Sequence, residues 1–222
     1  MRLWIFVSVI VVVTLSSACS LAPTPRAPQP SAAPFGAGGF EARAQAGRAV
    51  LKIEQLPLAA AKPLNDIARV GRGLQHACNA NLATDARRVD DAYGSWANDG
   101  KLPAIDEWVI VYDQPVAVTA VDEAQAALTC RDYPYIKKNF TVTIMGPLDV
   151  GPAPPGARMF AFCESIGQAS IQCTVIAGSG NLACSVRAAA QQKEEAIRLI
   201  QELLPLIRQA CLVRQSEFVI HS

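Results

Sequence analysis

The chain has 222 residues, of which 51% are hydrophobic, and a net charge of +1. A chain of this length buries one sizeable core, so one folded domain is expected. The near balance of charge and the lack of a basic run argue against nucleic acid as a partner, because such binding depends on neutralising many phosphates.

The N-terminal segment has the three-part pattern of an export signal. Arg2 precedes an apolar run over residues 3–15, and small residues then lead to Cys19. We expect a signal peptide over residues 1–18, with Cys19 as the new N-terminus that bacterial lipoproteins acylate with palmitate or a similar chain. Ser16 stands where an apolar residue is usual in that signal. Ordinary secretion and an uncleaved anchor are the alternatives.

A spacer follows the predicted anchor. Residues 19–40 hold Cys19 and a stretch rich in Pro, Ala and Gly, whose composition cannot bury enough apolar surface to fold. Its prolines favour extended backbone. We therefore expect a single globular domain over residues 41–222, held by a lipid on the outer face of the cell membrane.

Seven cysteines are an odd number for an exported protein. Acylation of Cys19 leaves six, and none of these lies in a CxxC pair, so a zinc ribbon or a redox motif is not expected. Export favours structural disulfides instead. The six are Cys78, Cys130, Cys163, Cys173, Cys184 and Cys211.

The middle of the chain predicts two helices and a strand. A helix is expected from Pro63, with one face made of Leu64, Ile67, Ala68, Leu74 and Cys78. Residues 87–101 are polar and turn-rich, which indicates a loop or broken helix. The segment EWVIVYD, residues 107–113, predicts an interior strand, and residues 122–130 predict a short alanine-rich helix.

The last third predicts strands at residues 140–145 and 158–164, followed by a hairpin. A turn at Gly178 and Ser179 would place Cys173 opposite Cys184 and put both cysteines on one face with Ile171, Val175, Leu182 and Val186, while the other face is mostly polar. This register predicts a Cys173–Cys184 disulfide.

A final helix is expected over residues 191–211, with an apolar stripe and a kink or break at Pro205. If the stripe packs on the sheet, Cys211 reaches Cys163, which leaves Cys78 for Cys130. A rival set joins Cys163 to Cys173 and Cys184 to Cys211.

The order of several segments resembles the extracellular sensor domain of PknH-type actinobacterial receptor kinases, a domain that also occurs in mycobacterial lipoproteins. The segments are Cys78, AYGSW, WVIVYD, the helix ending in Cys130, the hairpin from Cys173 with Asn181 in its second arm, and the last amphipathic helix. The resemblance implies an α+β fold, in which an antiparallel β-sheet packs against helices and disulfides stabilise the domain. It also implies a groove for a small ligand, a Cys78–Cys130 disulfide, and Cys173 as half of a second one.

Catalytic motifs are missing from the sequence, which has two histidines, His76 and His221. We expect neither cofactor nor metal. An enzyme, the third hypothesis, would need a nucleophile and a base brought together from distant segments.

Aromatic residues in polar segments are the candidates for a binding surface: Tyr93, Trp96, Tyr133 and Tyr135. The alternative is that these rings cover the ends of the sheet. The sequence therefore predicts a non-enzymatic envelope lipoprotein that acts as a ligand-binding or sensor-like domain. A protein-interaction module without a small ligand is the second hypothesis, so the expected partners are the membrane and either a small ligand or an envelope protein.

Overall fold

The computed structural model of this chain describes residues 39–64, 73–75, 77–134 and 140–213. The predicted signal peptide, Cys19, Tyr135 and both histidines lie outside the described residues. Within the described ranges, no helix is long and apolar enough to cross a membrane.

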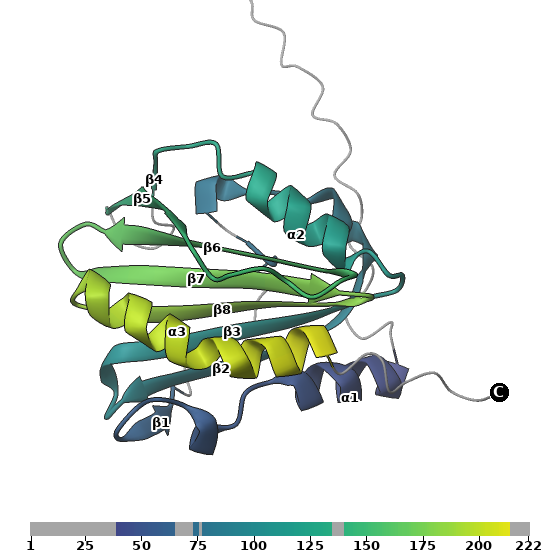
Figure 1. The fold of residues 1–222 in the computed structure, drawn as a ribbon, viewed down its shortest axis with the longest axis horizontal. Helices are drawn as coiled ribbons and strands as arrows, with labels where there is room; N and C mark the ends of the chain where they lie inside the picture. The colour runs from purple at the N-terminus through teal and green to yellow at the C-terminus, as the bar shows by residue number, and fades with distance from the viewer. Residues whose placement is uncertain (1–38, 65–72, 76, 135–139, 214–222) are drawn as a thin grey trace, which may run out of the picture. The chain divides into compact units, whose positions relative to one another are not determined.

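Eight antiparallel strands form one sheet in the order β1-β2-β3-β8-β7-β6-β5-β4 (Figure 1). The strands are β1 (Ala61–Pro63), β2 (Arg88–Asn98), β3 (Lys101–Tyr112), β4 (Asp132–Pro134), β5 (Thr141–Leu148), β6 (Ala157–Ile166), β7 (Ser170–Ser179) and β8 (Leu182–Ala190). The long hairpins β2–β3, β6–β7 and β7–β8 make the body of the sheet.

Helices cover both faces of the sheet and create two cores. Helices α1 (Gly39–Ala49) and α3 (Lys193–Arg208) contribute to the core on one face, which we call the α3 face, and α2 (Ala117–Ala126) contributes to the core on the other, the α2 face. Short helical turns are η1 (Ile53–Gln55), η2 (Ala77–Asn79), η3 (Ala83–Arg87) and the π-helical η4 (Gln209–Val213). The predicted α+β fold, with an antiparallel sheet, packed helices and disulfides, is confirmed.

Three predicted strands are present, and one predicted loop is not. EWVIVYD lies mostly in β3, and the strands expected at residues 140–145 and 158–164 correspond to β5 and β6. The prediction of a loop or broken helix over residues 87–101 is wrong, because most of this segment is β2. Asp99 and Gly100, with φ of +51° and +75°, make the tight turn that joins β2 to β3.

The two helices predicted in the middle of the chain are displaced or replaced. Pro63 ends β1 and pairs with Trp96, so the helix expected to start there is wrong at its beginning; Ile67 and Ala68 lie outside the described residues. Helix α2 overlaps the predicted range only in part. It begins earlier because the small residues Ala117, Ala120 and Ala124 form the stripe that approaches the sheet.

The β7–β8 hairpin forms with a different turn. Its turn consists of Gly180 and Asn181, two residues later than predicted, and Gly180 has a φ of +56°. The changed register places Cys173 opposite Ala188 instead of Cys184. Because each residue's partner moves by four positions, an even number, the predicted inward face is retained.

The disulfides follow this register. The predicted Cys173–Cys184 and Cys163–Cys211 pairs are wrong, because β6 places Cys163 directly opposite Cys173. The three bonds are Cys78–Cys130, Cys163–Cys173 and Cys184–Cys211, which include the favoured first pair and the rival set for the other four cysteines.

Helix α3 crosses the α3 face with a buried apolar stripe, as its sequence predicts (Figure 1). Of the kink or break predicted at Pro205, the break is wrong, since the helix continues to Arg208. Pro205 and Gln201, four residues earlier, are both exposed. Water can therefore bind the Gln201 carbonyl that lacks a helical donor.

Candidate functional site

A pocket of about 550 Å³ lies where the end of α2 meets the edge of the sheet at β5 and β6. Apolar side chains dominate its lining, as in most small-molecule sites. The lining residues are Gln125, Leu128, Ile144, Gly146, Pro147, Leu148, Asp149, Val150, Gly151, Met159, Phe160, Ala161 and Phe162.

Two phenylalanines from β6 form an aromatic wall of this pocket. Phe160 and Phe162 are two residues apart on the strand, so both point to the α2 face. Their ring centroids are 6.1 Å apart and the ring planes differ by 17°. Phe162 is buried and Phe160 half-buried, so Phe160 is the more accessible of the two rings.

Strand β5, next to the short edge strand β4, is irregular at the pocket. Its register with β6 shifts between Ile144 and Gly146, and Gly146 has a φ of +115°, a conformation that favours glycine. Pro147, the next residue, has no N–H to donate. Among the described residues, β4 pairs with β5 only at residues 141–143. The bulge therefore interrupts the edge beside the aromatic wall.

Helix α2 is held against the sheet by specific contacts. The Glu123 carboxylate accepts hydrogen bonds from the backbone N–H and the hydroxyl of Thr84, at 3.0 and 2.9 Å. Asp122 pairs with Arg158 of β6 at 2.9 Å. A Cβ on Gly178 would lie 2.8 Å from the carbonyl oxygen of Ala117, so the start of α2 and β7 are already in close approach.

The loop after β5 closes the other end of the pocket. The guanidinium of Arg208 donates to the carbonyl of Val150 at 2.7 Å, which links the loop to the end of α3. The Asp149 carboxylate accepts the Gly151 N–H at 2.9 Å. Asp149 is the one titratable side chain among the described residues that line the pocket. The pocket thus offers an apolar contact surface and a single exposed carboxylate.

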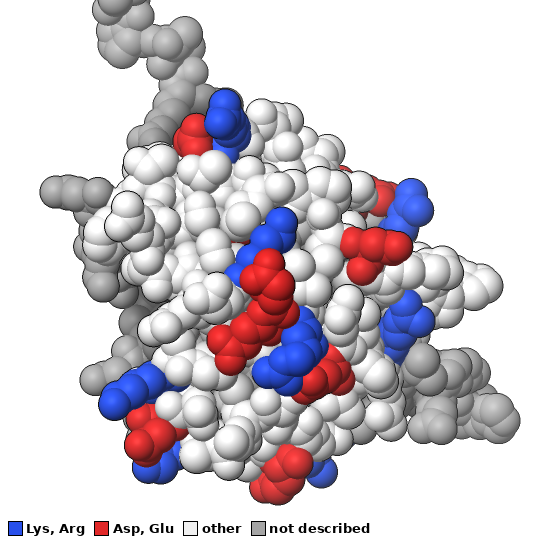
Figure 2. Space-filling model, turned by 60° about the vertical axis from the view of Figure 1, so that its left-hand side comes forward, with Lys and Arg blue, Asp and Glu red and all other residues white. Residues whose placement is uncertain are grey.

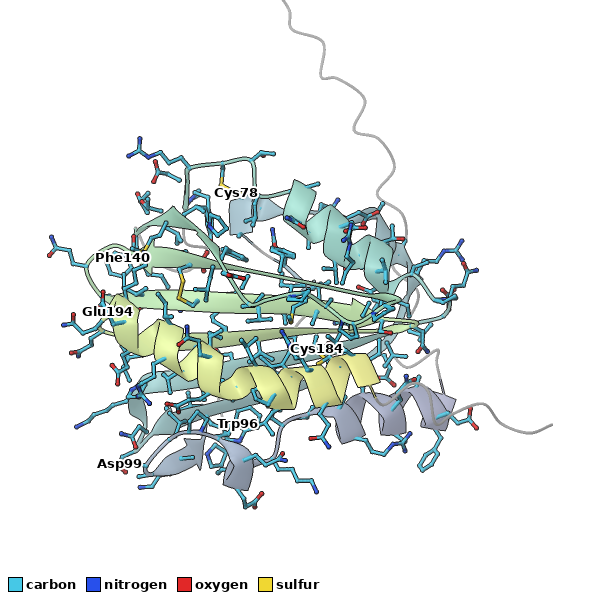
Figure 3. The ribbon with its side chains drawn as sticks, in the orientation of Figure 1. Cys78, Trp96, Asp99, Phe140, Cys184 and Glu194 are labelled. Atoms are coloured by element: carbon cyan, nitrogen blue, oxygen red, sulfur yellow. A yellow bond between two sulfur atoms is a disulfide. The ribbon has the colours of Figure 1, made fainter. Side chains whose placement is uncertain are left out.

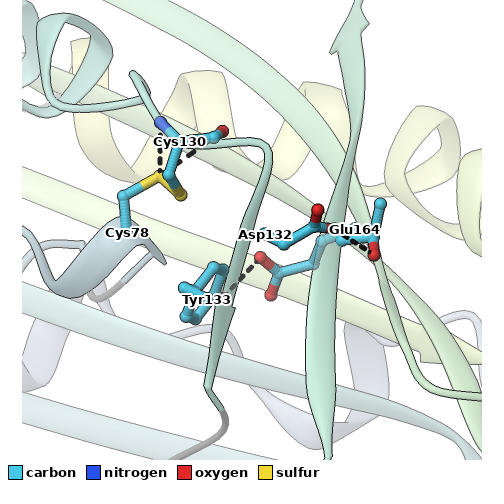
Figure 4. The surroundings of a disulfide bond; sticks show 6 residues. Cys78, Cys130, Asp132, Tyr133 and Glu164 are labelled. Atoms are coloured by element: carbon cyan, nitrogen blue, oxygen red, sulfur yellow. Dashed lines mark hydrogen bonds between the residues drawn. A yellow bond between two sulfur atoms is a disulfide. The ribbon is translucent and has the colours of Figure 1, made fainter. Parts of the chain in front are cut away.

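A buried polar contact lies on the same face of the sheet. The Tyr133 hydroxyl donates to the Glu164 carboxylate at 2.7 Å, close to the Cys78–Cys130 disulfide (Figure 4). Burial raises the pKa of Glu164, while the charge of Arg187 and the Tyr133 hydrogen bond lower it. Arg187 itself lies over the Trp108 ring, 5.3 Å from its centroid. This cluster joins strands from both halves of the sheet.

The other face of the sheet holds a second buried carboxyl group. Glu107 of β3 is fully buried, and its Oε2 accepts the Leu51 N–H at 2.7 Å. Burial raises the pKa of Glu107 to about 8, and the hydrogen bond from Leu51 opposes this shift. Burial therefore favours the protonated form of Glu107 at neutral pH.

Of the four aromatic residues predicted to bind a ligand, the three that the structure describes are not brought together. Tyr93 is half-buried, donates to Asp106 at 3.0 Å and lies 4.5 Å from the Trp108 ring. Trp96, also on β2, is 7% exposed and belongs to the core on the α3 face. Tyr133 lies on β4 at the far edge of the sheet, and Tyr135 is outside the described residues.

None of the three described residues lines the pocket. The aromatic wall was missed because Phe160 and Phe162 lie in a segment that the sequence assigns correctly to a strand. Two aromatic residues at a spacing of two were the available signal, since they must share a face.

Charges on the described surface are mixed. On the face in Figure 2, acidic and basic side chains alternate rather than collecting by sign. Exposed ion pairs such as Arg198–Glu202, at 2.7 Å, are part of this pattern.

Comparison with known proteins gives few matches. No family model matches the chain, and no curated protein matches it. Among solved structures, the chain is similar to the extracellular domain of PknH from Mycobacterium tuberculosis, with a TM-score of 0.40 and 11% sequence identity. The similarity covers 55% of this chain and 66% of that domain's chain.

Proposed function

We propose that this chain is a non-enzymatic domain that binds a small apolar molecule in the pocket between α2, β5 and β6. The observation that carries the proposal is the wall of Phe160 and Phe162 along a pocket of about 550 Å³. Ligand sites commonly have this size and an apolar lining with few polar groups. The flat rings suit a ring or chain that packs against them.

The pocket provides an apolar contact surface but lacks, among its described lining residues, a pair of groups for acid–base catalysis. Catalysis by proton transfer or nucleophilic attack needs two groups held within hydrogen-bond reach of one another. The described lining supplies one titratable group, Asp149, whose carboxylate is used by the Gly151 N–H. This supports a binding function over an enzymatic one.

A fluorescent probe tests the pocket directly. The neutral dye N-phenyl-1-naphthylamine is expected to bind the detergent-extracted full chain and to gain fluorescence. Phe160→Ala is expected to weaken binding by about 2- to 12-fold, the value of one aromatic contact. Leu128→Trp, which places a larger side chain in the pocket lining, is expected to weaken binding as well.

Phe140→Ala is the matched control, because Phe140 is 42% exposed and does not line the pocket. Equal dye binding by the Phe160 and Phe140 variants, or dye binding that Leu128→Trp leaves unchanged, contradicts the proposal.

We also propose that the domain is displayed on the outer face of the cell membrane through a lipid on Cys19. The export-signal pattern before Cys19 supports this location, and so do three disulfides, since such bonds persist in oxidising compartments. In the native host, Cys19→Ser is expected to release the protein from the membrane fraction, whereas Ser20→Ala is not. A membrane-bound Cys19→Ser protein contradicts the lipid anchor.

The same edge of the sheet favours a protein-docking function as second candidate. Met145 on β5 is 40% exposed and Phe140, just before β5, is 42% exposed. Exposed apolar side chains at an edge are common in interaction surfaces. For this function, Met145→Lys is expected to remove a co-purifying envelope protein without changing dye binding, and unchanged co-purification contradicts it.

A further inference from the structure

Three side chains of metal-ligand type converge in the core on the α3 face. They are Glu107 of β3, Cys184 of β8 and Cys211 of η4, and all three have 0% exposure. One ligand atom from each lies within 4.8 Å of the other two. This cluster is separate from the pocket proposed to bind a ligand.

Strand pairing and α3 create this juxtaposition. Cys184 pairs with Val109, so Glu107 is its diagonal neighbour on the same face of the sheet. Helix α3 crosses over Cys184 (Figure 3) and brings Cys211 to it from the end of the helix, where the disulfide forms. Each ligand therefore comes from a different element with its own support.

The Glu107 carboxyl group has an unused oxygen in this cluster. Oε2 accepts the Leu51 N–H at 2.7 Å, while Oε1 is buried and has no hydrogen-bond partner among the described residues. A buried polar atom without a partner is costly. The disulfide sulfurs are poor acceptors, so the oxidised cluster leaves this oxygen unsatisfied.

We propose that reduction of the Cys184–Cys211 disulfide converts this cluster into a metal site for Zn²⁺ or a similar thiolate-binding cation. Cysteine thiolates and Glu carboxylates are both ligands of Zn²⁺, and three protein ligands leave the fourth position to water. Ligand atoms around a tetrahedral Zn²⁺ are about 3.5 to 3.8 Å apart, given bonds of about 2.0 to 2.3 Å. The three ligand atoms lie within 4.8 Å of one another, so small side-chain movements after reduction would bring them to these separations.

The conversion balances in two steps. A dithiol reductant gives two electrons and two protons to the disulfide, which yields the Cys184 and Cys211 thiols and a cyclic disulfide of the reductant. Binding of M²⁺ then releases three protons, two from the thiols and one from the Glu107 carboxyl group. The Leu51 N–H stays on the carboxylate and orients it.

Cadmium binding by the reduced full chain tests this site. After treatment with dithiothreitol and anaerobic desalting, Cd²⁺ is added and the ultraviolet thiolate-to-metal charge-transfer band is followed. The background variant carries Cys78→Ser, Cys130→Ser, Cys163→Ser and Cys173→Ser, which removes the other two thiol pairs and leaves the proposed ligands intact. In this background we expect a tight site that is lost in Cys184→Ser/Cys211→Ser and is at least tenfold weaker in Glu107→Gln.

Folding of the reduced chain is checked by circular dichroism. If reduction unfolds the domain, metal-induced refolding becomes the readout, and it should require Glu107 as well as both cysteines. The proposal is overturned by absence of Cd²⁺ uptake or refolding, by uptake that persists without Cys184 and Cys211, or by equal affinity of the Glu107→Gln variant.

Discussion

Gly178→Ala probes the contact between α2 and β7. The new Cβ would lie 2.8 Å from the carbonyl oxygen of Ala117 and 2.9 Å from a methyl of Val121. Ordinary contacts begin near 3.4 Å, so α2 or β7 must move by roughly half an ångström. Since one of the opposing atoms belongs to the backbone, a side-chain rotation cannot relieve the contact.

The expected cost combines overpacking with a smaller gain. Overpacking of a close contact costs about 1–3 kcal/mol, and replacement of glycine by alanine recovers about 0.4–1 kcal/mol through the unfolded chain. The free energy of unfolding should therefore fall by about 0 to 2.6 kcal/mol, with a middle value of about 1.3 kcal/mol. For a domain of this size, Tm should fall by about 2–4 °C per kcal/mol.

Urea unfolding of the oxidised chain, followed by far-ultraviolet circular dichroism, measures this change. Gly47→Ala is the matched control: Gly47 lies inside α1, and a Cβ there meets nothing within 4 Å. That variant should be more stable than the parent by about 0.5–1 kcal/mol. If Gly178→Ala is as stable as Gly47→Ala, with unchanged m-values, the close approach of α2 to β7 is refuted.

Two mutational experiments and one peptide map of the disulfides test other parts of the structure. Burial raises the pKa of Glu164, so its contribution to stability is complete below about pH 4.5 and is lost as pH rises through the raised folded value. Glu164→Gln should remove this loss, and parallel stability curves for parent and variant between pH 4 and 8 would contradict it. Gly94→Ala should destabilise strongly because its Cβ would lie 2.1 Å from the Trp96 ring, and Trp96→Leu should relieve part of that loss in a double-mutant cycle of unfolding free energies. Non-reducing digestion with trypsin and a Glu-specific protease should give one linked species of three peptides, residues 159–164, 165–187 and 209–214. The first and third peptides joined without the second would instead indicate the Cys163–Cys211 pairing.

The alternation of apolar residues predicts which face of β7 and β8 is buried, yet it leaves their register open. A slip of two or four residues moves no side chain to the other face. The predicted and observed hairpins therefore bury the same side, while Cys173 faces Ala188 in one and Cys184 in the other. Choosing between them required the turn, since Gly180-Asn181 and Gly178-Ser179 both offer a glycine at the first position.

The wrong prediction of a loop over residues 87–101 overlooked a local turn signal in the sequence. The Asp99-Gly100 dipeptide is a strong hairpin signal, but the polar residues of β2 gave its segment a loop-like composition. β2 tolerates them because Ser95 and Tyr93 both donate to Asp106 on the neighbouring strand. Cross-strand partners of this kind depend on the register, which composition does not contain.

The burial of two glutamate side chains, Glu107 and Glu164, could not be predicted from the sequence. Glu107 opens an apolar run, a position at which a glutamate ordinarily marks the solvent-exposed start of a strand. Its burial depends on α1 and α3, which begin 68 residues before and 86 residues after it, packing on the same face. Glu164 is also buried, and its hydrogen-bond donor Tyr133 is 31 residues away in the sequence.

The two proposed sites divide the domain by face and by chemistry. The pocket lies where the pairing of β5 with β6 is irregular around Gly146 and Pro147, and apolar side chains line it. The Glu107 cluster, in contrast, is completely buried under α3. It cannot bind a metal ion as proposed while Cys184 and Cys211 remain joined in a disulfide. Because β7 lies between β6, which lines the pocket, and β8, which carries Cys184, loss of dye binding by Phe160→Ala should leave cadmium uptake unchanged, and Glu107→Gln should leave dye binding unchanged. Coupled loss of both would show that each variant acts through the stability of the shared sheet rather than through its own site.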